Sequence, residues 1–539
     1  MSSPSVRLSA NATPGSAWTP LRQPVFRMLW IAWLTANLCM WMNDVTAAWL
    51  MTSLSGEPVM VALVQAAATL PVFLLGAPSG ALADILDRRR YFIATQLWVA
   101  AVAVLLCIVA LAGVLTPMLL LSLTFANGIG LAMRWPVFAA LVPELVPRGE
   151  LGKALALNGV AMNASRVVGP VIAGAIIASA GGAWVFLLNA LLSIGVALAL
   201  LRWQRERKVS ALPAERFFGA LRVGFQYARQ SPELRGLLLR GFSFFLFSIA
   251  TLALLPVIAK QLPGGNAGTY SLLLATMGGG AILSVVLLPR VRQLFGRDAV
   301  AQYSTALNAL ATLGLALAPN LWLALPALLL AGMTWLATAN SITVSVQLAL
   351  PDWVRARGMS IYQMAMMGGS ALGAALWGQV ASLSDTRTSL GIAAGAALLV
   401  LLLVRRIQLE SDAGPDLTPE PFWDMPETTL PIAPHQGPVM VQIEYRIDPG
   451  QADAFKALMQ ESRRSRLRNG ALSWELFQDV VEPGRFIEYF VDGSWVEHMR
   501  QHERVTAHDR ALWERKKTFH LGEGPPRISH FIARRVRRD

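Results

Sequence analysis

Long apolar stretches separated by short polar segments dominate the chain as far as residue 404. The hydrocarbon core of a bilayer is about 30 Å thick, so a helix needs about 20 mostly apolar residues to cross it. Twelve such stretches follow one another along the chain. We therefore predict twelve membrane-spanning helices, at residues 26–52, 58–83, 91–113, 117–142, 155–180, 183–203, 236–259, 267–289, 299–318, 321–346, 357–382 and 388–404.

A second pattern begins near residue 437. VMVQIEYRI alternates apolar and polar residues as a half-buried strand does, and PGQADAFKALMQESRRSRL has the spacing of an amphipathic helix. The predicted elements are strand 439–447, helix 449–467, strands 471–480 and 485–492, helix 494–517 and strand 527–535. The order βαββαβ predicts an α+β domain with a ferredoxin-like layout.

The connection between the two parts is rich in proline and acid. Residues 407–436 contain six prolines, six acidic residues and no Lys or Arg, which is typical of a semi-extended tether. The first 25 residues lack the short apolar core of a cleavable signal peptide. The predicted domains are a cytoplasmic tail (1–25), a six-helix bundle (26–203), a cytoplasmic loop (204–235), a second six-helix bundle (236–406), the linker (407–436) and a cytoplasmic ferredoxin-like domain (437–539).

Composition and charge support a membrane protein. The chain is 54% hydrophobic and 15% charged, whereas soluble domains carry about 25% charged residues. The net charge of +13 does not indicate nucleic-acid binding, because the surplus lies in residues 1–406, with 28 Lys and Arg against 12 Asp and Glu. Both cysteines, Cys39 and Cys107, lie inside predicted helices and are interpreted as small packing residues.

The basic residues also fix the orientation. They gather at alternate loops, and cytoplasmic loops are the ones that carry Lys and Arg. The opposite side has only Lys260 and Arg387. Both termini are therefore predicted to be cytoplasmic, in a multi-pass protein of the inner membrane. The basic residues of the cytoplasmic side are Arg7, Arg22 and Arg27, Arg88 to Arg90, Arg148 and Lys153, nine residues between 202 and 240, Arg290, Arg292 and Arg297, Arg355 and Arg357, and Arg405 and Arg406.

The two predicted bundles share a weak internal repeat. VPELVPRGELGKALA at 142–156 resembles LPDWVRARGMSIYQ at 350–363, and GPVIAG at 169–174 resembles GAALWG at 373–378. Two six-helix halves with such similarity are typical of secondary transporters. The second-half positions that take part are Asp352, Arg355, Gly358, Gly373 and Gly378.

Several motifs resemble those of the major facilitator superfamily. Its loop motif between helices 2 and 3 is similar to Gly80-x-x-x-Asp84-x-x-Asp87-Arg88-Arg89-Arg90, with Asp87 where glycine is usual. SRVVGPVIAG at 165–174 is similar to the helix 5 motif of its antiporters. WMNDVTAAWL (41–50) and PELVPR (143–148) fit the branch of the enterobactin exporter, also called transmembrane secretion effectors. Residues 437–539 resemble the antibiotic-biosynthesis-monooxygenase type of dimeric α+β barrel, which implies a homodimer formed through this domain.

The resemblance implies roles for the motif residues. Gly76 and Gly80 lie one turn apart and permit close helix approach. Asp84 is expected to pair with an arginine of its own loop and with the end of helix 11, so that 76–90 acts as a latch on the cytoplasmic mouth. The alternative is that this loop only fixes orientation. Gly159, Gly169, Pro170 and Gly174 are expected to give helix 5 a bend and a smooth sealing face, or to serve ordinary helix packing.

Three charges fall inside predicted spans. Each of Asp44, Arg134 and Arg166 costs at least about 2.5–3.5 kcal/mol at a helix centre, so they are expected to face a central cavity. Asp44 would carry the coupling proton, because burial favours a neutral carboxyl group and a nearby arginine favours the ionised one. The alternative is that Asp44 and Arg134 lie near opposite rims and cap helices.

These observations predict a secondary transporter that exports a small amphipathic molecule, such as a siderophore or a drug-like compound, in exchange for protons. No GxxxxGK[ST] motif is present, so the energy source is expected to be the proton gradient, with no catalytic residue and no cofactor. His498 and His502 lie four residues apart, a weak metal-binding spacing. The alternatives are an importer or facilitator of the same fold, or a membrane-tethered enzyme or sensor acting through 437–539.

Overall fold

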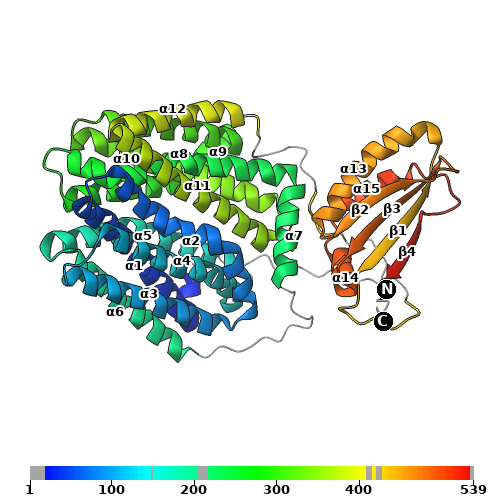
Figure 1. Ribbon diagram of the computed structural model, residues 1–539, viewed down its shortest axis with the longest axis horizontal. Helices are drawn as coiled ribbons and strands as arrows, with labels where there is room; N and C mark the ends of the chain where they lie inside the picture. The colour runs from blue at the N-terminus through cyan, green and yellow to red at the C-terminus, as the bar shows by residue number, and fades with distance from the viewer. Residues whose placement is uncertain are drawn as a thin grey trace, which may run out of the picture.

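The computed structural model describes residues 18–146, 150–203, 217–351, 353–407, 409, 416–420 and 428–534. A body of long helices is followed by a small body built on one sheet (Figure 1). A short 3-10 helix, η1 (Thr19–Arg22), precedes the first long helix. The long helices run close to the predicted spans, so the apolar pattern located them correctly.

Six long helices make up the first half of the helical body. Proline occupies the first turn of α1, α2 and α4, where its missing N–H is not needed. The bounds are α1 (Pro24–Leu54), α2 (Pro58–Ile85), α3 (Arg88–Leu111), α4 (Pro117–Leu145), α5 (Leu151–Ser179) and α6 (Gly182–Arg202).

The second half begins with a helix that was not predicted. Where a loop was expected, α7 forms because Val223, Tyr227 and Ala228 gather on one buried face. The bounds are α7 (Phe217–Gln230), α8 (Pro232–Gln261), α9 (Ala267–Leu317), α10 (Leu321–Leu348), α11 (Arg355–Leu383) and α12 (Thr386–Val404).

Helix α9 covers two predicted spans. It is broken at Gly296, whose φ of 68° lies in the left-handed region that glycine tolerates. Among the described residues, ten helices are long and apolar enough to cross a membrane, with α9 counted once and α11 outside this set. The protein is therefore a multi-pass membrane protein.

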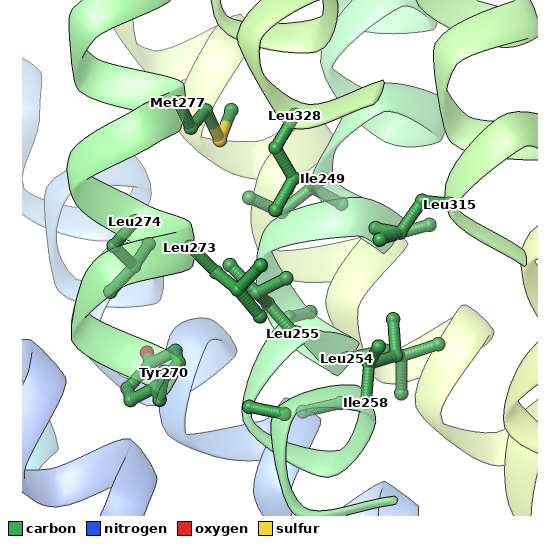
Figure 2. Packing of buried hydrophobic residues seen from close by; sticks show 14 of the residues in the cluster. Ile249, Leu254, Leu255, Ile258, Tyr270, Leu273, Leu274, Met277, Leu315 and Leu328 are labelled. Atoms are coloured by element: carbon green, nitrogen blue, oxygen red, sulfur yellow. The ribbon is translucent and has the colours of Figure 1, made fainter. Parts of the chain in front are cut away.

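The interior of the helical body is shared between its halves. One buried apolar cluster centres on α8, α9 and α10 (Figure 2). It also includes Met42 of α1, Ala62 of α2 and Ala173 of α5. The outside is apolar too: Leu317, Trp322, Leu383 and Leu403 are 69% to 79% exposed. An exterior of this kind suits contact with lipid, since soluble proteins rarely expose large apolar patches.

The small body is a four-stranded antiparallel sheet in the order β2-β3-β1-β4. Val441 and Ile443 of β1 pack with Phe455 of α13 and Trp513 of α15 in its core. The register of the central pair runs from Val439 opposite Asp492 to Arg446 opposite Arg485. The bounds are β1 (Val439–Arg446), η3 (Pro449–Gln451), α13 (Ala452–Arg468), β2 (Ser473–Gln478), β3 (Arg485–Asp492), α14 (Trp495–Glu503), α15 (Ala507–Lys517) and β4 (Arg527–Ile532).

Two details differ from the sequence-based expectation. The helix predicted over 494–517 is two helices, because Thr506 and Asp509 form a capping box that starts α15. The described part of the linker is also attached to the sheet domain. Glu420 N donates to Val505 O at 3.1 Å, and Trp495 N donates to Gln436 O at 2.8 Å.

Candidate functional site

Arg166 of α5 links the two halves inside the helical body. Its side chain is 8% exposed. The guanidinium carbon lies 5.6 Å from the ring centroid of Trp41 in α1 and 4.4 Å from that of Trp335 in α10. Cation–π contacts strengthen to about 2 kcal/mol or more when desolvated. Since α1 and α5 belong to the first half and α10 to the second, any separation of the halves here changes this contact.

Arg134 of α4 is buried with unmet donors. It is 3% exposed, and Nη1 donates to Ala36 O at 3.0 Å. Its guanidinium carbon lies 5.5 Å from the ring of Trp33, which stacks on Phe138 at 3.9 Å. Among the described residues, Nε and Nη2 have no hydrogen-bond partner. Unmet donors at this depth are costly, so this position favours water or an anionic group.

Asp44 lies in α1, less than one turn after Trp41. It is half-buried, and within the described part of the chain no hydrogen bond or ion pair joins it to another residue. Arg134 and Tyr270 of α9 are both within electrostatic range. Asp44 and Arg134 lie well inside helices that extend to Leu54 and Leu145, so the alternative that they cap helices does not describe this arrangement.

The halves also meet at the ends of α1, α2, α8 and α11 that lie opposite the basic loops. Lys260 Nζ donates to Thr52 O at 2.6 Å, and Val59 N donates to Ser382 Oγ at 3.0 Å. These contacts hold the two halves together on the side where the sequence predicted only two basic residues, one of which is Lys260.

The helix 5 glycines do not share a face, contrary to expectation. A Cβ on Gly169 would lie 2.7 Å from Trp41 Cβ, so this glycine meets α1. One on Gly174 would lie 2.0 Å from Ser271 Oγ, so Gly174 meets α9 of the other half. Gly159 has no neighbour within 4 Å. Pro170 lies inside α5, directly after Gly169.

The equivalent glycines of the second half make equivalent contacts. A Cβ on Gly373 would lie 2.2 Å from Leu246 O of α8, and one on Gly378 would lie 2.6 Å from Ala62 Cβ of α2. Gly169 and Gly373 thus meet a helix of their own half, whereas Gly174 and Gly378 meet the opposite half. The internal repeat is therefore a packing repeat as well.

Two more second-half positions sit at the start of α11. Arg355 Nη2 donates to Leu350 O at 3.3 Å. Gly358 admits the Leu350 side chain, which a Cβ would meet at 2.5 Å. Asp352 lies outside the described residues.

The loop motif between α2 and α3 is packed against neighbours rather than isolated. A Cβ on Gly76 would lie 3.0 Å from Met364 Cγ, and one on Gly80 would lie 3.7 Å from Ser360 Oγ, so both glycines face α11. The side chain of Asp84, in the last turn of α2, lies outside what the structure describes. Its expected pairing therefore stays a prediction.

The charged end of the motif organises the start of α3. Asp87 caps this helix, because its Oδ1 accepts from Arg90 N at 3.0 Å, which accounts for an aspartate in the usual glycine position. Arg89 Nε donates to Leu200 O at 3.0 Å and ties α3 to the end of α6. Arg88 is half-buried at the first residue of α3, and the Arg90 side chain is exposed.

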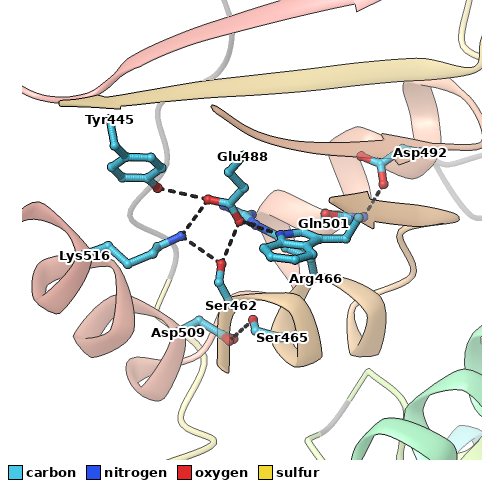
Figure 3. Close-up of polar contacts among 10 residues, drawn as sticks. Tyr445, Ser462, Ser465, Arg466, Glu488, Asp492, Gln501, Asp509 and Lys516 are labelled. Carbon is cyan, nitrogen blue, oxygen red and sulfur yellow. Dashed lines mark hydrogen bonds and ion pairs between the residues drawn. The ribbon is translucent and has the colours of Figure 1, made fainter. Parts of the chain in front are cut away.

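A buried polar cluster in the sheet domain had no counterpart in the sequence analysis. Glu488 of β3 is 0% exposed and accepts from Tyr445, Ser462, Trp474 and Lys516 at 2.7 to 3.1 Å (Figure 3). Burial alone would raise the pKa of Glu488, but Lys516 and Arg466, together with its donors, lower it to about 2. Burial lowers the pKa of Lys516 to about 8, so both partners are charged near neutral pH.

Glu488→Gln should destabilise the sheet domain by about 3–5 kcal/mol, because buried cations lose their counter-charge. Hydrogen exchange of β1 and β3 in the full chain measures this. Glu461→Gln is the matched control: its pair with Arg515 is exposed and should contribute about 0–1 kcal/mol.

Because the pKa of Glu488 is depressed from 4.5 to about 2, the stability that its ion pair gives the sheet domain is present above pH 4.5 and lost as the pH falls toward 2. An unchanged acid profile in Glu488→Gln would contradict this assignment.

The two candidate metal ligands, His498 and His502, do come together. Their Nε2 atoms lie 3.3 Å apart, and His498 Nδ1 lies 2.9 Å from Asp492 Oδ2. Burial and the neighbouring His498 lower the pKa of His530 to about 4. Among the described residues, no group of three or more His, Cys, Asp or Glu side chains is arranged to hold a metal ion.

The aromatic partners of the buried arginines were missed by sequence reasoning. Trp33, Trp41 and Trp335 are three of 17 tryptophans, and tryptophan is equally expected at membrane interfaces. Only the positions of Arg134 and Arg166 inside apolar stretches pointed to this region.

Comparison with known proteins places the chain among transporters. The model of the family described as transmembrane secretion effector matches residues 15–538. The staphyloferrin A transporter of Staphylococcus aureus is 24% identical over 330 residues, 60% of this chain and 81% of that protein. The enterobactin exporter EntS of Salmonella typhi is 27% identical over 347 residues, 62% and 83% respectively. Macrolide efflux protein A of Streptococcus pyogenes is 26% identical over 248 residues, 44% and 59% respectively.

Solved structures agree on the fold of the helical body. A bacterial homologue of the lysosomal transporter Spinster, in an inward-facing and occupied conformation, has a TM-score of 0.56 at 16% identity and covers 72% of this chain and 96% of that chain. The nucleoside transporter NupG has a TM-score of 0.56 at 13% identity, with coverage of 71% and 98%. Likeness at this identity shows the fold alone.

Proposed function

The chain belongs to the transmembrane secretion effector family of major facilitator transporters, and on that premise we propose that it exports a small amphipathic molecule, a siderophore or a drug-like compound, in exchange for protons. The names of its relatives, which include exporters of enterobactin and macrolides, support the direction and the kind of substrate. One observation carries the proposal. Arg166 sits between tryptophans of the two halves, in the same body as Asp44, which has no hydrogen bond to another described residue, and Arg134, two of whose donors have no partner among those residues.

We propose twelve spans, with α9 supplying two across the Gly296 break and α11 supplying one. Both termini and the sheet domain would then be cytoplasmic, in an inner membrane. The strand order β2-β3-β1-β4 supports a ferredoxin-like assignment for the sheet domain.

In this mechanism the two halves rock against each other, so that the mouth on one side of the buried charges is closed while the mouth on the other side is open. Lys260 and Thr52 hold one mouth shut. Gly76 and Gly80 let α2 approach α11 at the other end. Asp44 takes up a proton from one side and releases it to the other, while Arg134 and Arg166 interact with anionic or aromatic parts of the substrate.

Efflux from oriented proteoliposomes, with and without a pH gradient, tests the proposal. We expect accumulation against a concentration gradient only when a proton gradient is imposed. Counterflow without gradient-driven accumulation would identify a facilitator, and accumulation in the opposite direction an importer. Loss of all activity when residues 437–539 are deleted from a protein that still inserts would favour the tethered-enzyme alternative.

Gly174→Ala should slow efflux strongly, because the added Cβ would lie 2.5 Å from Ser271 Cβ across the seam between halves. Overpacking of about 1–3 kcal/mol lowers the population of the closed seam about 5- to 150-fold. Gly159→Ala, on the same helix with nothing within 4 Å, is the matched control and should transport normally. Adding Ser271→Gly to Gly174→Ala should restore activity. Equal efflux rates for the two alanine variants at equal membrane levels would refute a tight seam.

A further inference from the structure

The sheet domain contains a cavity, open to its surface, that the transport mechanism does not use. It has a volume of about 310 Å³ and lies between β1, β3 and β4 on one side and α13 to α15 on the other. Cavities from about 300 Å³ upward accommodate small organic ligands. Its wall includes Phe490, Leu512 and Trp513, with the imidazole rings of His498, His502 and His530. A ligand with one aromatic ring, or with two fused aromatic rings, matches this lining.

The charged groups of the cavity favour an anion. Asp509 on the wall already accepts from Ser465 Oγ at 2.5 Å, Arg468 Nη2 at 3.2 Å, Thr506 N at 3.1 Å and Thr506 Oγ1 at 2.8 Å, which fills the acceptor capacity of a carboxylate. Glu488 is fully buried behind the wall and holds Lys516. A cationic ligand would therefore meet no carboxylate with acceptor capacity to spare.

The cations, in contrast, face the cavity. Arg466 and Lys516 both line it, and the guanidinium carbon of Arg466 lies 4.3 Å from the ring centroid of Phe490. Both cations pair with Glu488, Lys516 Nζ at 3.1 Å and Arg466 Nε at 3.9 Å, so one carboxylate is shared by two cations and one positive charge is left over. A guanidinium has five N–H donors in a planar fork that matches a carboxylate. An aromatic ring bearing a carboxylate can therefore satisfy the apolar and the cationic parts of the wall at once.

Two arginines connect the cavity wall with the helical body. Arg468, which binds Asp509, lies 5.8 Å from the ring centroid of Tyr227 in α7. Arg504 donates from Nη1 to Asn469 O at 3.0 Å and lies 4.6 Å from the ring centroid of Trp353, just before α11. Tyr227 and Trp353 form an edge-to-face pair at 5.8 Å. Both arginines of the sheet domain thus pack against the same pair of aromatic rings in the helical body.

The aromatic pair in turn touches the helices of the transport body. Tyr227 Oη donates to Ala349 O at the end of α10 at 3.4 Å. A Cβ on Gly224 of α7 would lie 3.1 Å from Arg357 Cβ of α11, the helix that faces Gly76 and Gly80. A second link joins the bodies beside the pair, where Gln226 Nε2 donates to Ala471 O at 2.6 Å.

We propose that the cavity binds a small aromatic carboxylate and that its occupancy is transmitted through Tyr227 and Trp353 to α7 and the start of α11. The sheet domain would then be a ligand-sensing regulator of the helical body. Binding and transmission do not depend on what the helical body carries. The consequence, a change of transport rate, rests on the proposed function.

Binding is tested on the full chain in lipid nanodiscs, with 2-naphthoate as the probe and its neutral isostere 2-naphthamide as the control. Calorimetry should show saturable binding of naphthoate, with naphthamide about 10- to 100-fold weaker, as expected for loss of charge-assisted hydrogen bonds. Arg466→Gln should weaken naphthoate binding to a similar extent. Leu512→Trp, which fills the cavity, should abolish it. Absent binding by the unaltered chain, or equal affinity for the two probes, would overturn the proposal without any question of misfolding.

Transmission is tested by hydrogen exchange on the same samples. Naphthoate should change exchange in residues 217–230 and 353–360 of the unaltered chain, and Tyr227→Ala should lose this change while still binding the probe. Binding with no change in these segments would overturn the regulatory part. Failure of transport in proteoliposomes would overturn the proposed function and leave these two measurements standing.

Discussion

Arg166→Gln is expected to slow export strongly. Glutamine keeps hydrogen-bonding capacity but removes the cation that lies 4.4 Å from Trp335 and 5.6 Å from Trp41. Loss of about 2 kcal/mol of desolvated cation–π energy lowers the rate about 30-fold when the contact stabilises the transition between conformations. Efflux from cells with equal amounts of protein in the membrane is the measurement.

Conservative variants separate the charge from the volume at this position. Arg166→Lys keeps the cation and should retain part of the activity. Trp335→Phe keeps an aromatic face and should be milder than Trp335→Ala. Arg387→Gln serves as the control, because that arginine is exposed in the first turn of α12. Full export by Arg166→Gln would show that the bridge between the halves plays no part in transport.

The main features of the fold could be predicted because a bilayer imposes a length and a composition on each span. Two boundaries could not. Residues 290–298 were predicted as a loop, whereas helix extends up to Gly296, and the positive φ of this glycine makes the break between the two segments of α9. Helix α7 was read as loop because its basic residues hid the buried face of Val223, Tyr227 and Ala228. Tyr227 and Ala228 join a buried cluster with residues of α8, α10 and α11, a tertiary contact that the local sequence does not reveal.

The candidate site was predictable in its charges and not in their partners. An isolated Asp or Arg in an apolar stretch is rare and costly, which makes it a strong signal. Tyr270, which lies near Asp44 but in the other half, is an uncharged residue in an apolar stretch, so the sequence does not single it out. Glu488 was equally hidden: in RFIEYFVD apolar residues occupy both faces of the strand, so the pattern does not show that Glu488 lies on the buried face with Phe486 and Phe490. Only the three-dimensional positions of Lys516 and Arg466 explain how its charge is accommodated there.

Asp44→Asn is expected to uncouple transport from the proton gradient. The carboxyl group has no hydrogen-bond donor among the described residues, and Arg134 is within electrostatic range, so both protonation states are accessible as the surroundings open and close. Asparagine cannot change charge, so gradient-driven accumulation should vanish while substrate exchange continues at equal pH. Glu57→Gln, at an exposed carboxylate just before α2, should leave the dependence on the gradient intact. Proteoliposomes with an imposed pH gradient distinguish the two variants. If Asp44→Asn still accumulates substrate in proportion to that gradient, the coupling proton travels by another group.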